Sequence, residues 1–190
     1  MIFNERSFIR LLKRELKTGL IYGYLEENYV FGGANWRAAI HQDKVTQGIL
    51  GELMKMTALY PKNGAVFTVN KEKMAQYTIT HPREFKEPDD GHELGVTDII
   101  INDYLRVTAG SELRLIFEDF IHVLDQDSVT DEEYRYEGPF YSESEDNFFW
   151  KNDTCILKVS NEYRGVYNET LDLLRKMNVA FPINERYTFH

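Results

Sequence analysis

The stretch from residue 81 to 95 holds the densest group of side chains that could bind a metal ion or transfer a proton. It contains the run Asp89-Asp90-Gly91-His92-Glu93, with His81, Glu84 and Glu87 close by. Carboxylates and imidazoles are common ligands of divalent cations. Adjacent residues rarely all point at one ion, and no second ligand pair stands at a spacing typical of a metal site. We therefore predict no metal and no cofactor. We expect this segment to form a loop, and an enzyme with a carboxylate and histidine site in it remains an alternative.

Two further motifs that could support chemistry have simpler interpretations. Cys155 is the only cysteine and lies in the apolar run Cys155-Ile156-Leu157, which predicts a buried, inert thiol and excludes an intramolecular disulfide. The run Gly32-Gly33-Ala34-Asn35 could hold a phosphate on its backbone amides, but no Walker lysine and no dinucleotide-binding glycine pattern accompanies it. A tight turn is the favoured interpretation of these glycines.

A row of basic residues marks the N-terminal segment. At 100° per residue its members fall within an arc of about 100° on one helix face. Phe8, Leu11 and Leu12 fall on another face, Asn4 is suited to cap the helix start, and Gly19 is suited to follow its end. We therefore predict a helix that buries an apolar face and exposes a cationic row, and we take this row as the candidate site for a protein partner. The cationic row consists of Arg6, Arg10, Lys13, Arg14 and Lys17.

Charge is distributed unevenly along the chain. The formal charge is −9, from 22 basic and 31 acidic residues. Residues 84–146, which we call the acidic segment, hold 19 acids and 4 bases, so their charge is −15 and that of the remaining residues is +6. Three interpretations stay open for this segment: ordinary solvated surface, a surface for a basic protein partner, or a mimic of the nucleic-acid backbone.

Length and composition favour one soluble globular domain over residues 1–190, with 178–190 as a C-terminal tail. The longest runs without a formal charge have nine residues, far short of the roughly 20 apolar residues that a membrane helix needs. We therefore predict no membrane insertion. No apolar signal segment follows the first basic residues, and the single cysteine suits a reducing compartment, so we expect a cytoplasmic protein.

Hydrophobic spacing predicts an α+β fold that is mainly helical, with two or three short antiparallel hairpins. Hairpins are expected over 20–31 and 148–159, and further strands over 65–69 and 76–80. Besides the N-terminal helix, helices are expected over 35–60, 98–108, 111–124 and 162–177.

The two adjacent helices expected over 98–108 and 111–124 raise the question of a helix-turn-helix motif. The second of them would carry Glu112, Glu118 and Asp119 toward the DNA, against the single Arg114. Carboxylates in that position would repel the phosphates. We therefore predict no sequence-specific DNA reading by this element.

The chain as a whole resembles small uncharacterised bacterial proteins of Mu-like prophage regions. The residues that carry the resemblance are the opening Met1-Ile2-Phe3-Asn4-Glu5-Arg6-Ser7-Phe8 and the run Phe31-Gly32-Gly33-Ala34-Asn35-Trp36. The resemblance implies a bacterial cytoplasm and an accessory role in a phage or host setting, and it supplies no catalytic residues. Together with the charge pattern, it leads us to expect a non-enzymatic factor that binds another protein through separate basic and acidic surfaces.

Overall fold

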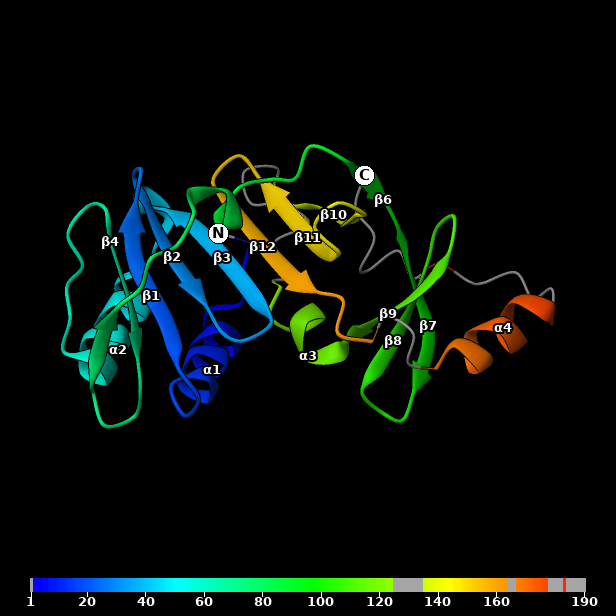
Figure 1. Cartoon of the computed structure of the whole chain (residues 1–190), viewed down its shortest axis with the longest axis horizontal. Helices are drawn as coiled ribbons and strands as arrows, with labels where there is room; N and C mark the ends of the chain where they lie inside the picture. Colours follow the sequence, from blue (N-terminus) through cyan, green and yellow to red (C-terminus); the bar gives the residue numbers. More distant parts are fainter. Residues whose placement is uncertain (1, 125–134, 164–166, 178–182, 184–190) are drawn as a thin grey trace.

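The protein is built mainly from two antiparallel β-sheets, as the computed structural model in Figure 1 shows. The structure describes residues 2–124, 135–163, 167–177 and 183. The larger sheet has nine strands in the order β5-β4-β1-β2-β3-β12-β11-β10-β6, and the smaller has three in the order β7-β8-β9. This predominance of strands corrects our prediction of a mainly helical α+β fold.

The strands of the larger sheet come from both halves of the chain. They are β1 (Leu20–Leu25), β2 (Asn28–Gly32), β3 (Trp36–His41), β4 (Ala65–Val69), β5 (Ala75–Tyr77), β6 (Gly91–Glu93), β10 (Glu137–Ser142), β11 (Asn147–Asn152) and β12 (Cys155–Ser160). The smaller sheet contains β7 (Gly95–Ile101), β8 (Leu105–Ala109) and β9 (Leu113–Phe117). The helices are α1 (Glu5–Glu15), α2 (Gln47–Thr57), α3 (Glu118–Ile121) and α4 (Asn168–Lys176), with short 3-10 helices η1 (Gln42–Lys44) and η2 (Pro82–Phe85).

The N-terminal helix and the predicted hairpins are confirmed. The side chain of Asn4 accepts a hydrogen bond from the Ser7 backbone N–H at 3.1 Å and so caps α1. β1 pairs with β2, and β11 pairs with β12. The turn between β1 and β2 places Glu26 and Glu27 at φ values of 47° and 68°, the left-handed geometry that a two-residue hairpin turn requires.

The helix predicted over 35–60 is wrong in its first part, where the chain forms β3, and α2 covers only Gln47–Thr57. β3 lies inside the larger sheet between β2 and β12, and both of its faces are covered. Trp36, Ala38 and Ile40 pack in the main core, whereas Ala39 packs on the opposite face. A strand buried on both sides lacks the alternation of apolar and polar residues that would have identified it.

The helices predicted over 98–108 and 111–124 are also wrong, because β7, β8 and β9 occupy these residues and only the short α3 is helical. Residues 98–124 therefore do not form a helix-turn-helix motif.

In the 81–95 segment, predicted as a loop, the chain forms η2 and then β6, the edge strand of the larger sheet. The last predicted helix is shorter than expected and begins at Asn168. Of the tail predicted over 178–190, only Ile183 lies within the described residues, and it forms an antiparallel bridge with Thr97.

Three hydrophobic clusters hold these layers together. The main core lies between the larger sheet and α1 and α2, where Phe8 meets Phe31 edge-on at 5.3 Å and Trp36 at 6.2 Å between ring centroids. A second core on the opposite face of this sheet is covered by Phe85 of η2. The third cluster lies between the smaller sheet and Leu171 of α4, and Figure 1 shows α4 beyond this sheet, far from α1 and α2.

Candidate functional site

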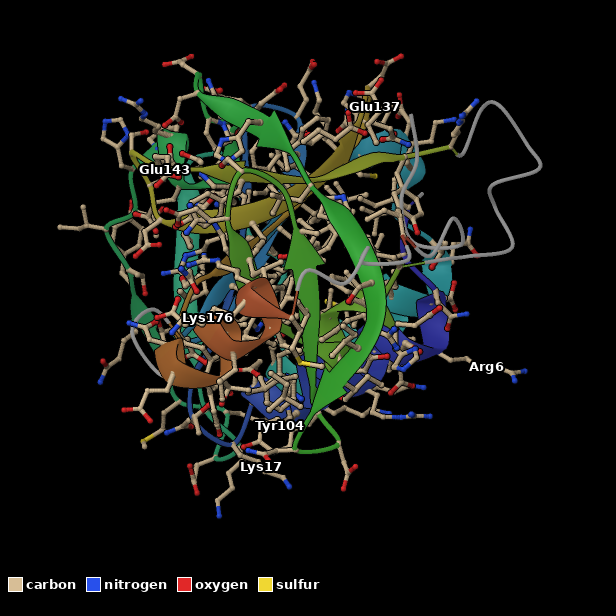
Figure 2. The ribbon with its side chains drawn as sticks, turned by 90° about the vertical axis from the view of Figure 1, so that its right-hand side faces the viewer. Arg6, Lys17, Tyr104, Glu137, Glu143 and Lys176 are labelled. Atoms are coloured by element: carbon tan, nitrogen blue, oxygen red, sulfur yellow. The ribbon has the colours of Figure 1, made fainter. Side chains whose placement is uncertain are left out.

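The cationic row runs along the outer face of α1 and just past its end. All five of its residues are exposed, while Phe8, Leu11 and Leu12 on the opposite face are buried. Figure 2 shows Arg6 and Lys17 projecting away from the body of the molecule. The amphipathic geometry predicted for this helix is therefore present.

Two members of the cationic row are engaged in ion pairs. Lys13 Nζ lies 2.8 Å from Glu52 Oε2 on α2, and Arg14 Nη1 lies 2.7 Å from Asp119 Oδ2 on α3. Within the described residues, no ion pair is formed by the other three members, Arg6, Arg10 and Lys17. These three cations are consequently available to an external partner.

The acidic segment is largely paired within the molecule. Basic residues from outside it reach its carboxylates in the pairs Arg37–Glu84 (3.1 Å), Arg83–Asp89 (3.5 Å), Lys151–Glu87 (2.7 Å) and Lys158–Glu145. Arg106–Glu118 and Arg114–Glu143, both at 2.5 Å, are pairs inside the segment. Charges that are separated in the sequence thus meet in space. The five acids between residues 125 and 134 lie outside the described residues.

The carboxylates of the 81–95 segment are dispersed rather than gathered. Asp90 accepts hydrogen bonds from the Ser142 hydroxyl at 2.5 Å and from the backbone N–H and hydroxyl of Ser144 at 2.8 and 3.0 Å. These bonds, that from Ser142 above all, lower the pKa of Asp90 to about 2. Glu84, Glu87 and Asp89 are each occupied by a different basic residue. Across the described ranges, no three histidine, cysteine, aspartate or glutamate side chains converge on a point where a metal ion could bind.

The two glycines that precede β3 form a turn rather than a phosphate cradle. The Gly33 backbone N–H already donates to the Trp36 carbonyl oxygen at 3.1 Å. A Cβ at Gly33 would lie 2.3 Å from Oε2 of the buried Glu15 and 2.5 Å from the indole nitrogen of Trp36. Because a carboxylate already stands at this turn, a phosphate would be repelled from it.

Cys155 is buried, as its apolar surroundings predicted, and only 4% of it is exposed. Burial raises the pKa of its thiol above the usual value, because the thiolate would lose its hydration. The residue therefore lacks the thiolate character that a nucleophile needs.

Two polar cavities were missed by the sequence analysis. One, of about 500 Å³, lies between β9 and α4 and includes Arg114, Tyr163 and Arg175 in its lining. The other, of about 190 Å³, lies where β3 begins and β12 ends, and it is lined by Trp36, Asn147 and Lys158 among others. Because the residues that line each cavity come from distant parts of the chain, no motif with a fixed spacing could have identified them.

Comparison with known proteins adds no relative. The chain matches no family model, no curated protein and no solved structure. In the part of the chain that the structure describes, every helix is too short or too polar to cross a bilayer.

Proposed function

We propose that the protein is a non-enzymatic factor that docks onto an acidic surface of another protein through the cationic row of α1. The observation that carries the proposal is the state of Arg6, Arg10 and Lys17. These three residues stay exposed and form no ion pair with any described residue, although the chain holds 31 acids. Our earlier expectation also included an acidic docking surface, but the acidic segment has many internal partners, so the proposal relies on α1 alone.

The rigidity of α1 supports this role. Its apolar face packs in the main core, and Lys13 and Arg14 form ion pairs with residues of α2 and α3. The free cations therefore project from a fixed backbone, which lowers the conformational entropy lost on binding. Complementary charge of this kind contributes mainly to the rate and specificity of association.

Protein fits the cationic row better than nucleic acid or a membrane. Duplex DNA carries a negative charge about every 1.7 Å, and it would be repelled by a molecule whose formal charge is −9. An interfacial helix must insert its apolar face among the lipids, but that face of α1 is already buried against the sheet. An acidic patch on a protein is local, so it can meet the row without facing the remaining negative charge.

Charge reversal at Arg6, Arg10 and Lys17, all to Glu, tests the proposal. The matched control reverses Lys62, Lys73 and Lys176, which are also exposed cations and lie away from α1 (Lys176 is labelled in Figure 2). Both triple variants change the formal charge from −9 to −15, since each reversal subtracts two charges. The probe is a short poly-L-glutamate peptide, with duplex DNA and phosphatidylserine vesicles as competing ligands, and binding is measured by titration calorimetry at low salt.

We expect the α1 variant to bind poly-L-glutamate about tenfold more weakly than the control variant, since three exposed charge pairs of about 0.5 kcal/mol each combine to that factor. Equal binding by the two variants, or stronger binding of DNA or vesicles than of the acidic peptide by the unaltered protein, would refute the proposal. Residence in the cytoplasm and an accessory role in a phage or host setting remain predictions from the sequence.

A further inference from the structure

The larger sheet ends at β5, and the outer edge of this strand is open to solvent. Every residue of β5 is exposed. In the described part of the chain β5 pairs only with β4, with Ala75 opposite Val69 and Tyr77 opposite Phe67. Figure 1 shows β4 at the end of the molecule that is remote from α4. An open edge presents backbone groups to which another strand can add.

The backbone groups on this edge follow from the pairing of β5 with β4. Just beyond β5, the Thr78 N–H donates to the Val66 carbonyl oxygen at 2.9 Å. Successive residues of an antiparallel strand direct their N–H and C=O groups alternately toward a neighbouring strand and away from it. Tyr77 and Ala75 therefore direct these groups away from β4, whereas Gln76 directs its own toward β4. None of the outward groups has a hydrogen-bond partner among the described residues.

The other sheet edges within the described ranges are covered, partly occupied or charged. Ile183 already forms an antiparallel bridge with β7. Only 2% of Leu115 in the middle of β9 is exposed, so another strand could not reach its backbone. β6 contains Glu93 and follows Asp90, so a second copy of this acidic chain would be repelled there. β5 is consequently the edge that is best suited to accept a strand.

β5 also lacks the charged residues that protect many strand edges from pairing. Residues 74–82 carry no formal charge, although the whole chain carries −9. Met74, Tyr77 and Ile79 are 61%, 65% and 93% exposed, so apolar side chains accompany the open backbone. Two copies of the chain can therefore meet along this edge without bringing like charges together.

From this edge we propose that the protein forms a symmetric dimer in which β5 pairs antiparallel with β5 of a second copy. With the two-fold axis at Gln76, Ala75 of each copy lies opposite Tyr77 of the other. The outward N–H and C=O groups of both residues then find partners, and the two larger sheets join into one. Because the large side chain of Tyr77 meets the small Ala75, the pairing is sterically complementary.

The affinity of this dimer is limited by the shortness of β5. Interfaces that bury less than about 1,200 Å² are typical of weak complexes, so we expect a dissociation constant on the order of 10 µM. Sedimentation equilibrium of the full chain should show the mass rising from monomer to dimer across that concentration. Amide hydrogen exchange locates the interface: the Ala75 and Tyr77 N–H should exchange more slowly as the dimer forms, while that of Gln76, already directed toward β4, changes little.

A charge exchange at the two-fold axis tests the register. Gln76→Lys and Gln76→Glu each place like charges opposite one another, and either variant alone should dimerise about tenfold more weakly or worse. An equimolar mixture of the two variants pairs opposite charges and should restore the dimer. The matched controls are Gln47→Lys and Gln47→Glu at the exposed start of α2, which make the same charge changes and should dimerise as the unaltered protein does.

Three outcomes would overturn the proposal. They are a monomer at every concentration, a dimer that the Gln76 variants do not weaken, and a mixture of the two variants that associates no better than each alone. Should a Gln76 variant fail to fold, as judged by circular dichroism, the mass and the Ala75 and Tyr77 exchange of the unaltered protein still decide the matter. None of these residues belongs to the cationic row, so this proposal and the proposed function can fail separately.

Discussion

Arg106 on β8 and Glu118 at the start of α3 form a two-pronged ion pair in which Nε and Nη2 each lie 2.5 Å from a carboxylate oxygen. Nη1 of the same arginine donates to the Thr97 carbonyl oxygen at 2.8 Å and so joins β7 to β8. The two side chains are only 7% and 12% exposed. The pair thus holds β8 of the smaller sheet against the start of α3, whose residues pack in the main core.

Removing one partner of this pair should destabilise the protein strongly. In Glu118→Gln the buried guanidinium loses its two-pronged counter-charge and keeps the longer, more exposed pair with Asp98 at 3.8 Å, and we expect the free energy of unfolding to fall by about 3 kcal/mol. Urea unfolding followed by circular dichroism measures the change. The matched control is Asp172→Asn, which breaks the exposed pair Arg175–Asp172 on α4 and should cost less than about 0.5 kcal/mol. Similar losses in the two variants would show that burial does not govern the strength of the Arg106–Glu118 pair.

Glu52 on α2 makes the contact between α1 and α2 sensitive to acid. The hydrogen bond from Lys13, and after it that from Lys55, lowers the pKa of Glu52 from 4.5 to about 2. A carboxyl whose pKa is lower in the folded state stabilises the fold above its unfolded pKa, and this contribution disappears as the pH falls toward the folded pKa. The stabilisation from Glu52 is therefore complete above about pH 4.5 and is lost by about pH 2.

Lys13→Met tests this relationship. The substitution should raise the pKa of Glu52 toward 4.5, as measured by carbon-detected titration of the side-chain carboxyls. The stability difference between variant and unaltered protein should be largest at neutral pH and vanish near pH 2, below both pKa values. Lys71→Met, which removes an exposed lysine 3.8 Å from Glu72, is the control and should leave the pKa of Glu52 unchanged. The interpretation fails if both variants shift this pKa alike.

The sequence predicted helix α1, whose two faces differ, and missed strand β9, whose two faces are alike. In α1, Phe8 and Leu12 are buried while Arg6 and Arg10 are exposed, so the helical period is visible. In β9, Leu113 and Leu115 face the smaller-sheet cluster and Ile116 faces the main core, so both faces are apolar. Joined to Phe120 and Ile121 of α3, these residues imitate a helical period of 3.6, which is why a helix was predicted there.

The candidate sites differ in predictability for a related reason. The cationic row is local, because its five residues lie within twelve positions on one helix, and its geometry follows from the helical period. The cavity of about 190 Å³ where β3 begins and β12 ends depends on β3 and β11 flanking β12, and this order is set by pairing across more than 100 residues. Nothing local in the run around Trp36 or around Asn147 specifies that pairing, so only the folded structure reveals the cavity.

Cys155 should behave as an unreactive thiol in the native protein. It is 4% exposed, and burial raises the pKa of the thiol, so almost no thiolate is present at neutral pH. We expect its reaction with Ellman's reagent to proceed only as fast as the protein unfolds, and to become immediate in concentrated urea. Lys73→Cys, an exposed thiol in the same protein, is the control and should react at once. Rapid modification of Cys155 in the native state would contradict the burial described here.

Two glycine substitutions should have opposite effects on stability. Gly33→Ala places a Cβ 2.3 Å from Glu15 Oε2 and 2.5 Å from Trp36 Nε1, so the carboxylate and the indole must move. We expect the free energy of unfolding to fall by about 2 kcal/mol, a loss typical of an overpacked site, and the nuclear magnetic resonance signal of the Trp36 indole N–H to be displaced.

Gly51 lies on the exposed side of α2, and a Cβ there meets nothing within 4 Å. Gly51→Ala should therefore stabilise the protein by about 0.5–1 kcal/mol through the helix preference of alanine. Thermal unfolding of both variants checks the signs, and a stabilised Gly33→Ala would mean that Glu15 and Trp36 do not enclose this turn.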